Sequence, residues 1–82
     1  MTHIQVLGIG CEKCRTLTAN AEAAVREMGI EARIDKVEKV QEIMAFGIMT
    51  TPALVVDGAV KSAGRALRVD DIKKLLQQED ER

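Results

Sequence analysis

Hydrophobic and polar positions along the chain follow two periods, one typical of strands and one typical of helices. Residues 3–8 form a short apolar run that predicts a buried strand. Between Glu12 and Met28, apolar side chains recur every three or four residues, which is the stripe of an amphipathic helix. That stripe consists of Leu17, Ala21, Ala24, Val25 and Met28. Gly29 follows at once and suits the left-handed backbone that ends many helices.

The spacing of apolar residues changes twice in the middle of the chain. Residues 30–35 alternate apolar and charged side chains, which predicts a strand with one wet face, at or near the edge of a sheet. A helical period then begins at Val37 and ends at Gly47; its apolar members are Val37, Val40, Ile43 and Met44. Pro52 excludes a helix just before it, because the residue preceding a proline is pushed into extended geometry.

The last third of the chain predicts a hairpin and a helix. The continuous apolar run Ala53–Val56 suits a central strand, and Asp57-Gly58 is a strong two-residue hairpin signal. Residues 59–62 would be the returning strand. Asp70 is the expected N-cap of a final helix, and residues 77–82 are expected to fray. The apolar positions of that helix are Ile72, Leu75 and Leu76.

Together these elements predict an α/β fold in the order β-α-β-α-β-β-α. The first β-α-β unit requires parallel strands with a right-handed connection, whereas the later hairpin requires antiparallel strands. We therefore expect a mixed four-stranded sheet flanked by helices. At 82 residues the chain is long enough for one small domain, spanning residues 1–82.

Composition narrows the class of protein. The net charge is −1 with both signs interspersed, and Phe46 is the single aromatic residue. This argues against a nucleic-acid partner, because neither a basic stripe nor aromatic stacking platforms are present. No apolar run approaches the ~18 residues of a membrane span, and the N-terminus does not resemble a signal peptide. We expect a monomeric cytoplasmic protein with no cofactor and no membrane partner.

The chemistry lies in the two cysteines, Cys11 and Cys14, which are the only ones in the chain. They stand where the first strand passes into the first helix. An anion at a helix N-terminus is stabilised by free N–H groups and by the macrodipole, so the pKa of Cys11 is expected below the ~8.5 of a free thiol. Cys14 continues the apolar stripe of the helix. We therefore expect Cys11 to be an exposed nucleophile and Cys14 a more buried resolving thiol.

Other uses of the pair were weighed against this hypothesis. One alternative is that the cysteines pack as two small apolar side chains. A zinc site needs four ligands, and two thiols plus His3 would complete one only with a second chain. The segment from Gly8 to Asp35 also fits a ferredoxin-like heavy-metal-binding chaperone, although Ile9 stands where those domains usually carry Met, and their element order is β-α-β-β-α-β. A binding module with little turnover is a further alternative.

Over nearly its whole length the chain resembles the thioredoxin fold in its short, glutaredoxin-like form, closest to the small redox-active disulfide proteins. Three features carry the resemblance: Cys11-Glu12-Lys13-Cys14 between strand and helix, Thr51-Pro52 before a strand, and the hairpin that follows. The Trp-Cys-Gly-Pro-Cys of thioredoxins is absent, and Ala63-Gly64-Arg65 stands roughly where glutaredoxins hold glutathione.

The resemblance implies a thiol–disulfide oxidoreductase that acts on protein disulfides, with a disulfide reductase as electron donor. Cys11 and Cys14 would be catalytic, and Thr51 and Pro52 would shape the substrate groove, with a cis peptide bond between them. No metal site is implied. The direction of electron flow, the identity of the donor and the physiological substrate do not follow from the sequence.

Overall fold

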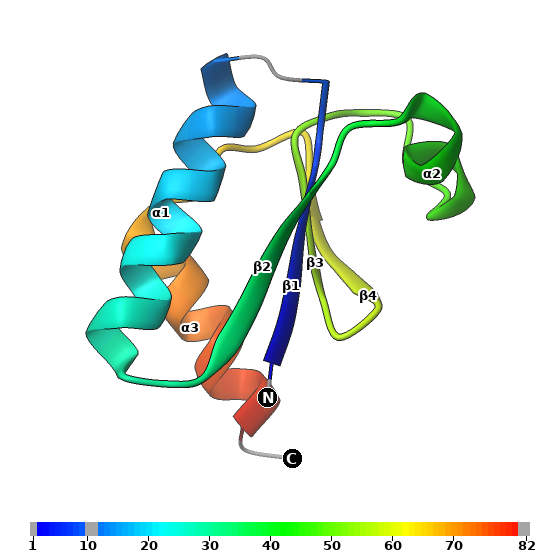
Figure 1. Cartoon of the computed structure of the whole chain (residues 1–82). Helices are drawn as coiled ribbons and strands as arrows, with labels where there is room; N and C mark the ends of the chain where they lie inside the picture. The colour runs from blue at the N-terminus through cyan, green and yellow to red at the C-terminus, as the bar shows by residue number, and fades with distance from the viewer. Residues whose placement is uncertain (1, 10–11, 81–82) are drawn as a thin grey trace.

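The computed structural model describes residues 2–9 and 12–80. The elements follow the predicted order (Figure 1). They are β1 (Thr2–Leu7), α1 (Glu12–Met28), β2 (Ala32–Val37), α2 (Val40–Ala45), β3 (Ala53–Val56), β4 (Ala59–Ala63) and α3 (Val69–Asp80). Within the described residues, no helix combines the length and the apolar character needed to cross a membrane.

The four strands form one mixed sheet in the order β2-β1-β3-β4. β1 and β2 are parallel, whereas β3 runs antiparallel to both β1 and β4. This confirms the parallel first unit, the antiparallel hairpin, the edge position of β2 and the interior position of β3. Because β3 runs antiparallel to β1 and Leu7 pairs with Ala53, the end of β1 and the start of β3 lie at the same end of the sheet (Figure 1).

Helices cover both faces of the sheet. α1 and α3 lie together on one face, and the short α2 lies on the other (Figure 1). The alternation along β3 explains how one strand serves both layers, since successive side chains point to opposite faces. Leu54 and Val56 join the core under α1 and α3, while Ala53 and Val55 join the smaller core under α2. All four side chains are fully buried.

The predictions made from short turn motifs, the end of α1 and the hairpin, are confirmed. Gly29 has φ +66°, and its N–H donates to the carbonyls of Val25 and Arg26, so α1 ends as predicted. Asp57 and Gly58 have φ +50° and +84°, the two positive values that a tight hairpin turn requires. The β3–β4 hairpin is therefore specified by two residues.

The start of the second helix was wrongly predicted at Val37. Val37 instead ends β2, pairs with Leu7 across the parallel ladder, and is 8 % exposed in the core under α2. Ladder hydrogen bonds and burial outweigh a helical period over so short a stretch. β2 also begins later than predicted, at Ala32 rather than at residue 30, and α2 begins at Val40.

Other boundaries move by smaller amounts. The first strand ends at Leu7 rather than Gly8, and β4 extends to Ala63. Asp70 is not the N-cap of α3, because the helix already begins at Val69 and the Arg68 carbonyl accepts its first hydrogen bond, from Ile72. The Asp70 carboxylate still lies in the first turn, where the macrodipole favours it. Residues 77–80 continue the helix, and residues 81–82 lie outside the described residues.

Candidate active site

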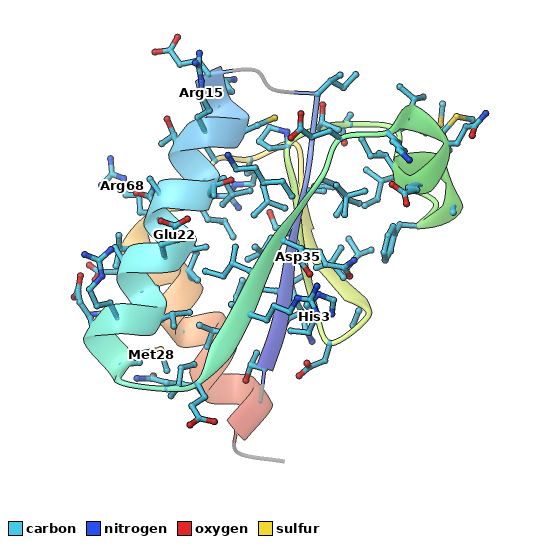
Figure 2. The ribbon with its side chains drawn as sticks, viewed as in Figure 1. His3, Arg15, Glu22, Met28, Asp35 and Arg68 are labelled. Atoms are coloured by element: carbon cyan, nitrogen blue, oxygen red, sulfur yellow. The ribbon has the colours of Figure 1, made fainter. Side chains whose placement is uncertain are left out.

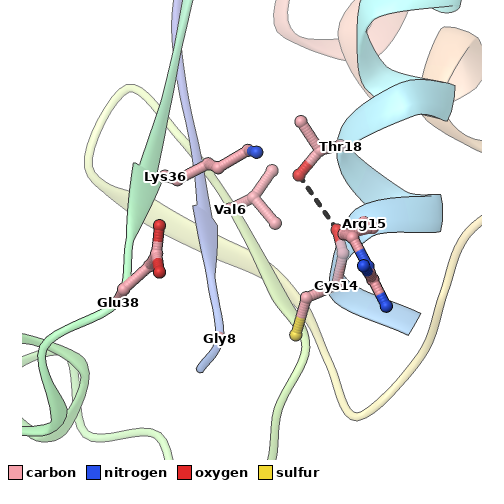
Figure 3. Close-up of a pocket in the computed structure, with 7 residues that line it drawn as sticks. All are labelled: Val6, Gly8, Cys14, Arg15, Thr18, Lys36 and Glu38. Atoms are coloured by element: carbon pink, nitrogen blue, oxygen red, sulfur yellow. Dashed lines mark hydrogen bonds between the residues drawn. The ribbon is translucent and has the colours of Figure 1, made fainter. Parts of the chain in front are cut away.

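Cys14 lies in the first turn of α1, on the stripe that faces the sheet. It is 6 % exposed, and Leu17 and Ala21 below it are fully buried. Figure 3 shows its sulfur pointing away from the helix into the space beside the end of β1. This confirms the predicted burial of Cys14. Cys11 lies outside the described residues; in the sequence it immediately precedes Glu12, the first residue of α1.

Gly8 makes room for the Cys14 sulfur. A Cβ atom built on Gly8 would stand 2.1 Å from Cys14 Sγ and 3.1 Å from Cys14 Cβ, so no side chain fits there. Sequence analysis treated Gly8 only as the end of a strand and missed this contact. The available signal was a glycine at the end of a buried strand, which often marks a close approach of another group.

Pro52 also lies close to the same point. Its Cα is 4.0 Å from the position of that Cβ atom, and its side chain is fully buried. The Thr51–Pro52 peptide bond, expected to be cis, is cis. Thr51 is exposed beside it. The structure thus brings Cys14 and Pro52 together, although 38 positions separate them in the sequence numbering.

The residues after β4 hold the Pro52 segment in place. The Gly64 N–H donates to the Pro52 carbonyl at 2.8 Å, and Gly64 has φ +79°. A Cβ on Gly64 would also stand 3.4 Å from Thr50 Oγ1. Gly64 therefore combines a left-handed backbone with a hydrogen bond that braces the segment entering β3.

A cavity of about 140 Å³ lies behind the Cys14 sulfur, between α1 and the ends of β1 and β2 (Figure 3). Its lining consists of Val6, Gly8, Cys14, Arg15, Thr18, Lys36 and Glu38. Thr18 is buried and donates its hydroxyl to the Cys14 carbonyl at 2.9 Å, within the helix. The remaining polar groups of the cavity are one carboxylate and two cations, which makes its charge mixed.

A second hollow, of about 270 Å³, lies on the α2 side and is apolar. It is lined by Ile9, Val40, Ile43, Met44, Ile48, Met49 and Thr51. Ile9 is 65 % exposed and Met49 is 98 % exposed, so this apolar groove opens to solvent. Its lining includes Ile9, which comes shortly before Cys11 in the sequence, and Thr51, which immediately precedes Pro52. Exposed apolar surface of this kind is typical of a binding site.

His3 is remote from Cys14. It lies near the start of β1, five residues from Gly8, which in a strand is about 16 Å. Its Nε2 lies 2.8 Å from Asp35 Oδ2, and Arg33 Nε lies 3.0 Å from the same oxygen (Figure 2). Among residues 2–9 and 12–80, no three His, Cys, Asp or Glu side chains are placed to hold a metal ion.

The fold and the site define a class of protein: an α/β thiol–disulfide oxidoreductase with Cys14 in the first turn of a helix, close to a cis-proline. Comparison with known proteins gives the family. A family model described as thioredoxin domain matches residues 2–77. The chain belongs to the thioredoxin domain family, and it is a thiol–disulfide oxidoreductase.

Two similar proteins cover almost the whole chain. A thioredoxin of Methanothermobacter thermautotrophicus is 41 % identical over 76 residues, which are 93 % of this chain and 99 % of that protein. A thioredoxin of Methanocaldococcus jannaschii is 37 % identical over 76 residues, which are 93 % of this chain and 87 % of that protein. Thioredoxins in general act on protein disulfides together with a reductase.

The metallochaperone alternative fails on topology. The ferredoxin-like domains have the order β-α-β-β-α-β, whereas this chain has a helix between its second and third strands. The similar proteins named above give it no support either.

Proposed function

We propose that this chain exchanges electrons with protein disulfides through Cys11 and Cys14, as a single cytoplasmic domain that works as a monomer. One observation carries the proposal: Cys14 lies in the first turn of α1 with its sulfur against Gly8 and close to Pro52. A disulfide reductase would supply the electrons. The net charge is −1, and the two cysteines of the chain stand in one Cys-x-x-Cys motif. Both features support a disulfide reductase as the partner and the cytoplasm as the compartment.

The proposed reaction has two exchange steps. The Cys11 thiolate attacks one sulfur of the substrate disulfide, a mixed disulfide forms, and the other substrate sulfur leaves as a thiolate. The Cys14 thiolate then attacks the Cys11 sulfur, and the second substrate sulfur leaves. The substrate gains two electrons, and the protein retains a Cys11–Cys14 disulfide that the reductase converts back to two thiols.

The apolar groove supports a protein segment as the substrate. Its lining residues Ile9 and Thr51 flank the two segments that carry Cys11 and Pro52. A polypeptide whose disulfide lies at the dithiol can place a neighbouring apolar side chain against Met44 or Met49. Such contacts hold the reacting sulfurs in position, which a small hydrophilic disulfide does not achieve.

Serine substitutions test the two roles. Cys11→Ser should abolish dithiothreitol-driven reduction of insulin, because the proposed attacking thiol is gone and the remaining thiol, Cys14, is buried. Cys14→Ser should instead accumulate a mixed disulfide through Cys11, detectable by mass spectrometry of the intact protein. Ala19→Ser places a serine on the exposed face of the same helix and should behave like the unaltered chain.

Two results would contradict these assignments. Undiminished insulin reduction by Cys11→Ser would remove Cys11 as the nucleophile. Adducts found on Cys14 of the Cys11→Ser chain, and none on Cys11 of the reciprocal variant, would reverse the two roles.

A further inference from the structure

The apolar groove on the α2 side carries two exposed methionines. Met44 belongs to α2 and is 67 % exposed, while Met49 stands three residues before Pro52 and is 98 % exposed. Both side chains line the groove. A side chain that stays in water adds little to the stability of the fold, because the hydrophobic contribution grows with the apolar area removed from water. Core packing therefore does not account for these two side chains.

Their sulfur atoms set Met44 and Met49 apart from the rest of the groove. A thioether is oxidised to a sulfoxide, which turns a flexible apolar side chain into a polar and chiral one. The exposure of both side chains gives a dissolved oxidant direct access to the two sulfurs. The other residues that line the groove carry aliphatic or hydroxyl side chains; they are Ile9, Val40, Ile43, Ile48 and Thr51.

Met28 provides an internal comparison. It is the last residue of α1, is half-buried, and packs against the core under α1 and α3 (Figure 2). It is not among the residues that line the groove. An oxidant therefore reaches Met28 less easily than it reaches Met44 or Met49, and a sulfoxide at Met28 would lie outside the groove.

A sulfoxide would change what the groove can bind. Its oxygen is a hydrogen-bond acceptor, and burying that oxygen against an apolar segment without a donor costs free energy. Thr51 supplies the one hydroxyl of the lining, and the other lining side chains are apolar. Oxidation should therefore weaken the contact with a protein segment while the thiols of Cys11 and Cys14 keep their chemistry. A small disulfide that makes no contact with the groove would still react.

We propose that Met44 and Met49 are oxidation sites through which hydrogen peroxide turns off the reduction of protein disulfides, while the dithiol still reacts with small disulfides. The inference rests on the proposed function and concerns its groove. At each site the peroxide O–O bond breaks, an S–O bond forms on the thioether, and water leaves; the sulfur loses two electrons and the peroxide gains them. Peroxide also converts the dithiol to a disulfide, which a disulfide reductase reverses. The sulfoxides persist until a methionine sulfoxide reductase removes them.

Protection of the cysteines isolates the effect on methionine. The chain is first converted to the Cys11–Cys14 disulfide, treated with hydrogen peroxide, freed of peroxide, reduced with dithiothreitol and freed of that reductant. Peptide mapping by mass spectrometry locates each added oxygen. The reduced chain is then mixed with excess insulin or with excess bis(2-hydroxyethyl) disulfide, a small hydrophilic disulfide. The intact mass of acid-quenched samples measures how fast the chain loses its two thiols to each substrate.

Two variants locate the effect. Met44→Leu/Met49→Leu keeps apolar side chains in the groove and removes both oxidisable sulfurs from it. Met28→Leu is the matched control, because it removes a methionine that does not line the groove. Each chain is compared with itself before and after peroxide, so that differences in starting activity do not enter the result.

The expected result is confined to the protein substrate. Peroxide should add oxygen to Met49 and Met44 before Met28, following their exposure. The rate with insulin should then fall roughly tenfold, while the rate with the small disulfide should change by less than about twofold. Met28→Leu should lose its insulin rate to the same extent, whereas Met44→Leu/Met49→Leu should retain its own. Treatment of the oxidised chain with methionine sulfoxide reductases should restore the insulin rate.

The outcomes distinguish this inference from the proposed function. An insulin rate that survives oxidation of Met44 and Met49, or resistance of both sulfurs to peroxide, would overturn the inference and leave the dithiol function standing. Equal slowing with both substrates, or equal loss in Met44→Leu/Met49→Leu, would overturn it as well. A chain that leaves insulin disulfides intact before any peroxide treatment would instead contradict the proposed function, and the inference would fall with it.

Discussion

The tightest constraint at this site falls on Gly8, a residue without a side chain. The Cys14 sulfur occupies the place that a Cβ on Gly8 would need, and Pro52 Cα lies 4.0 Å from that place. Interiors are packed densely enough that even one added methyl group is felt. Gly8 therefore decides how close the Cys14 thiol, which we propose to be the resolving one, comes to the backbone at the end of β1.

Gly8→Ala tests this contact. A methyl group at 2.1 Å from the sulfur forces Cys14 or the start of α1 to move, so insulin reduction should slow by roughly 10- to 100-fold. The free energy of unfolding should fall by about 1–3 kcal/mol, as in other overpacked sites. Urea denaturation and the insulin assay measure the two effects separately.

Gly47→Ala is the control for the backbone cost of replacing a glycine. Gly47 has φ +76° with no atom within 4 Å of an added Cβ, so the substitution should cost about 1 kcal/mol and leave insulin reduction unchanged. Retention of full activity by Gly8→Ala would show that the Cys14 sulfur has other positions that serve equally well.

Among the elements, α1 contributes most to the site. Its stripe places Leu17, Ala21 and Ala24 against the sheet and leaves its first turn beside Gly8 and the entrance to β3. Of the two cysteines, Cys14 lies within the bounds of this helix. Cys14 is buried on the stripe, whereas Cys11 precedes the first helical residue in the sequence.

Alkylation should reveal this asymmetry. Iodoacetamide should modify Cys11 faster than Cys14 at neutral pH, because the N-terminal dipole of α1 favours a thiolate there and burial hinders the reagent at Cys14. Peptide mapping after timed alkylation over a pH series measures both rates. The Cys11→Ser and Cys14→Ser variants exclude disulfide formation as a cause. Equal rates for the two cysteines across neutral pH would contradict the prediction.

At the scale of the whole molecule, residues that are far apart in the sequence are in contact at both ends of the sheet. The site end gathers Gly8, Cys14 and Pro52. At the opposite end, the His3 N–H donates to Asp57 Oδ1 at 2.9 Å, while the Asp57 N–H donates to the His3 carbonyl. These bonds tie the first strand to the β3–β4 turn, and the contact between His3 and Asp35 ties it to β2.

The contacts of Asp35 at this opposite end of the sheet predict a contribution to the free energy of unfolding that is lost in acid. The hydrogen bond from His3, together with the hydrogen bond and charge of Arg33, holds the pKa of Asp35 below its ordinary 3.8, although partial desolvation opposes them. A carboxyl whose pKa is lower in the folded state stabilises the fold above the unfolded pKa. That contribution is lost as pH falls through the folded pKa.

Asp35→Asn should therefore be less stable than the unaltered chain at neutral pH, and the difference should shrink as the pH drops below 3.8. Denaturant unfolding at a series of pH values measures it. Arg33→Gln should reduce the same difference, since Arg33 helps to lower the pKa. A difference that stays constant down to strongly acid pH would show that Asp35 contributes through packing and not through its charge.

Much of the architecture followed from local patterns. The period of α1, the apolar run of β3, Gly29 and Asp57-Gly58 each specify their own geometry within a few residues, because helix caps and tight turns depend on short-range sterics. Cys14 was expected on the buried side of its helix, and the helical period was enough to show it.

Contacts between distant segments were decided only by the tertiary structure. Val37 reads as helical in isolation, yet pairing with Leu7 in the ladder makes it a strand residue. The fit of Gly8 around the Cys14 sulfur and the approach of Lys36 and Glu38 behind it have no period and no short motif, because they arise where β1, β2 and α1 meet. The sequence by itself predicts that Cys11 and Cys14 react; packing of the sheet against α1 decided what surrounds Cys14.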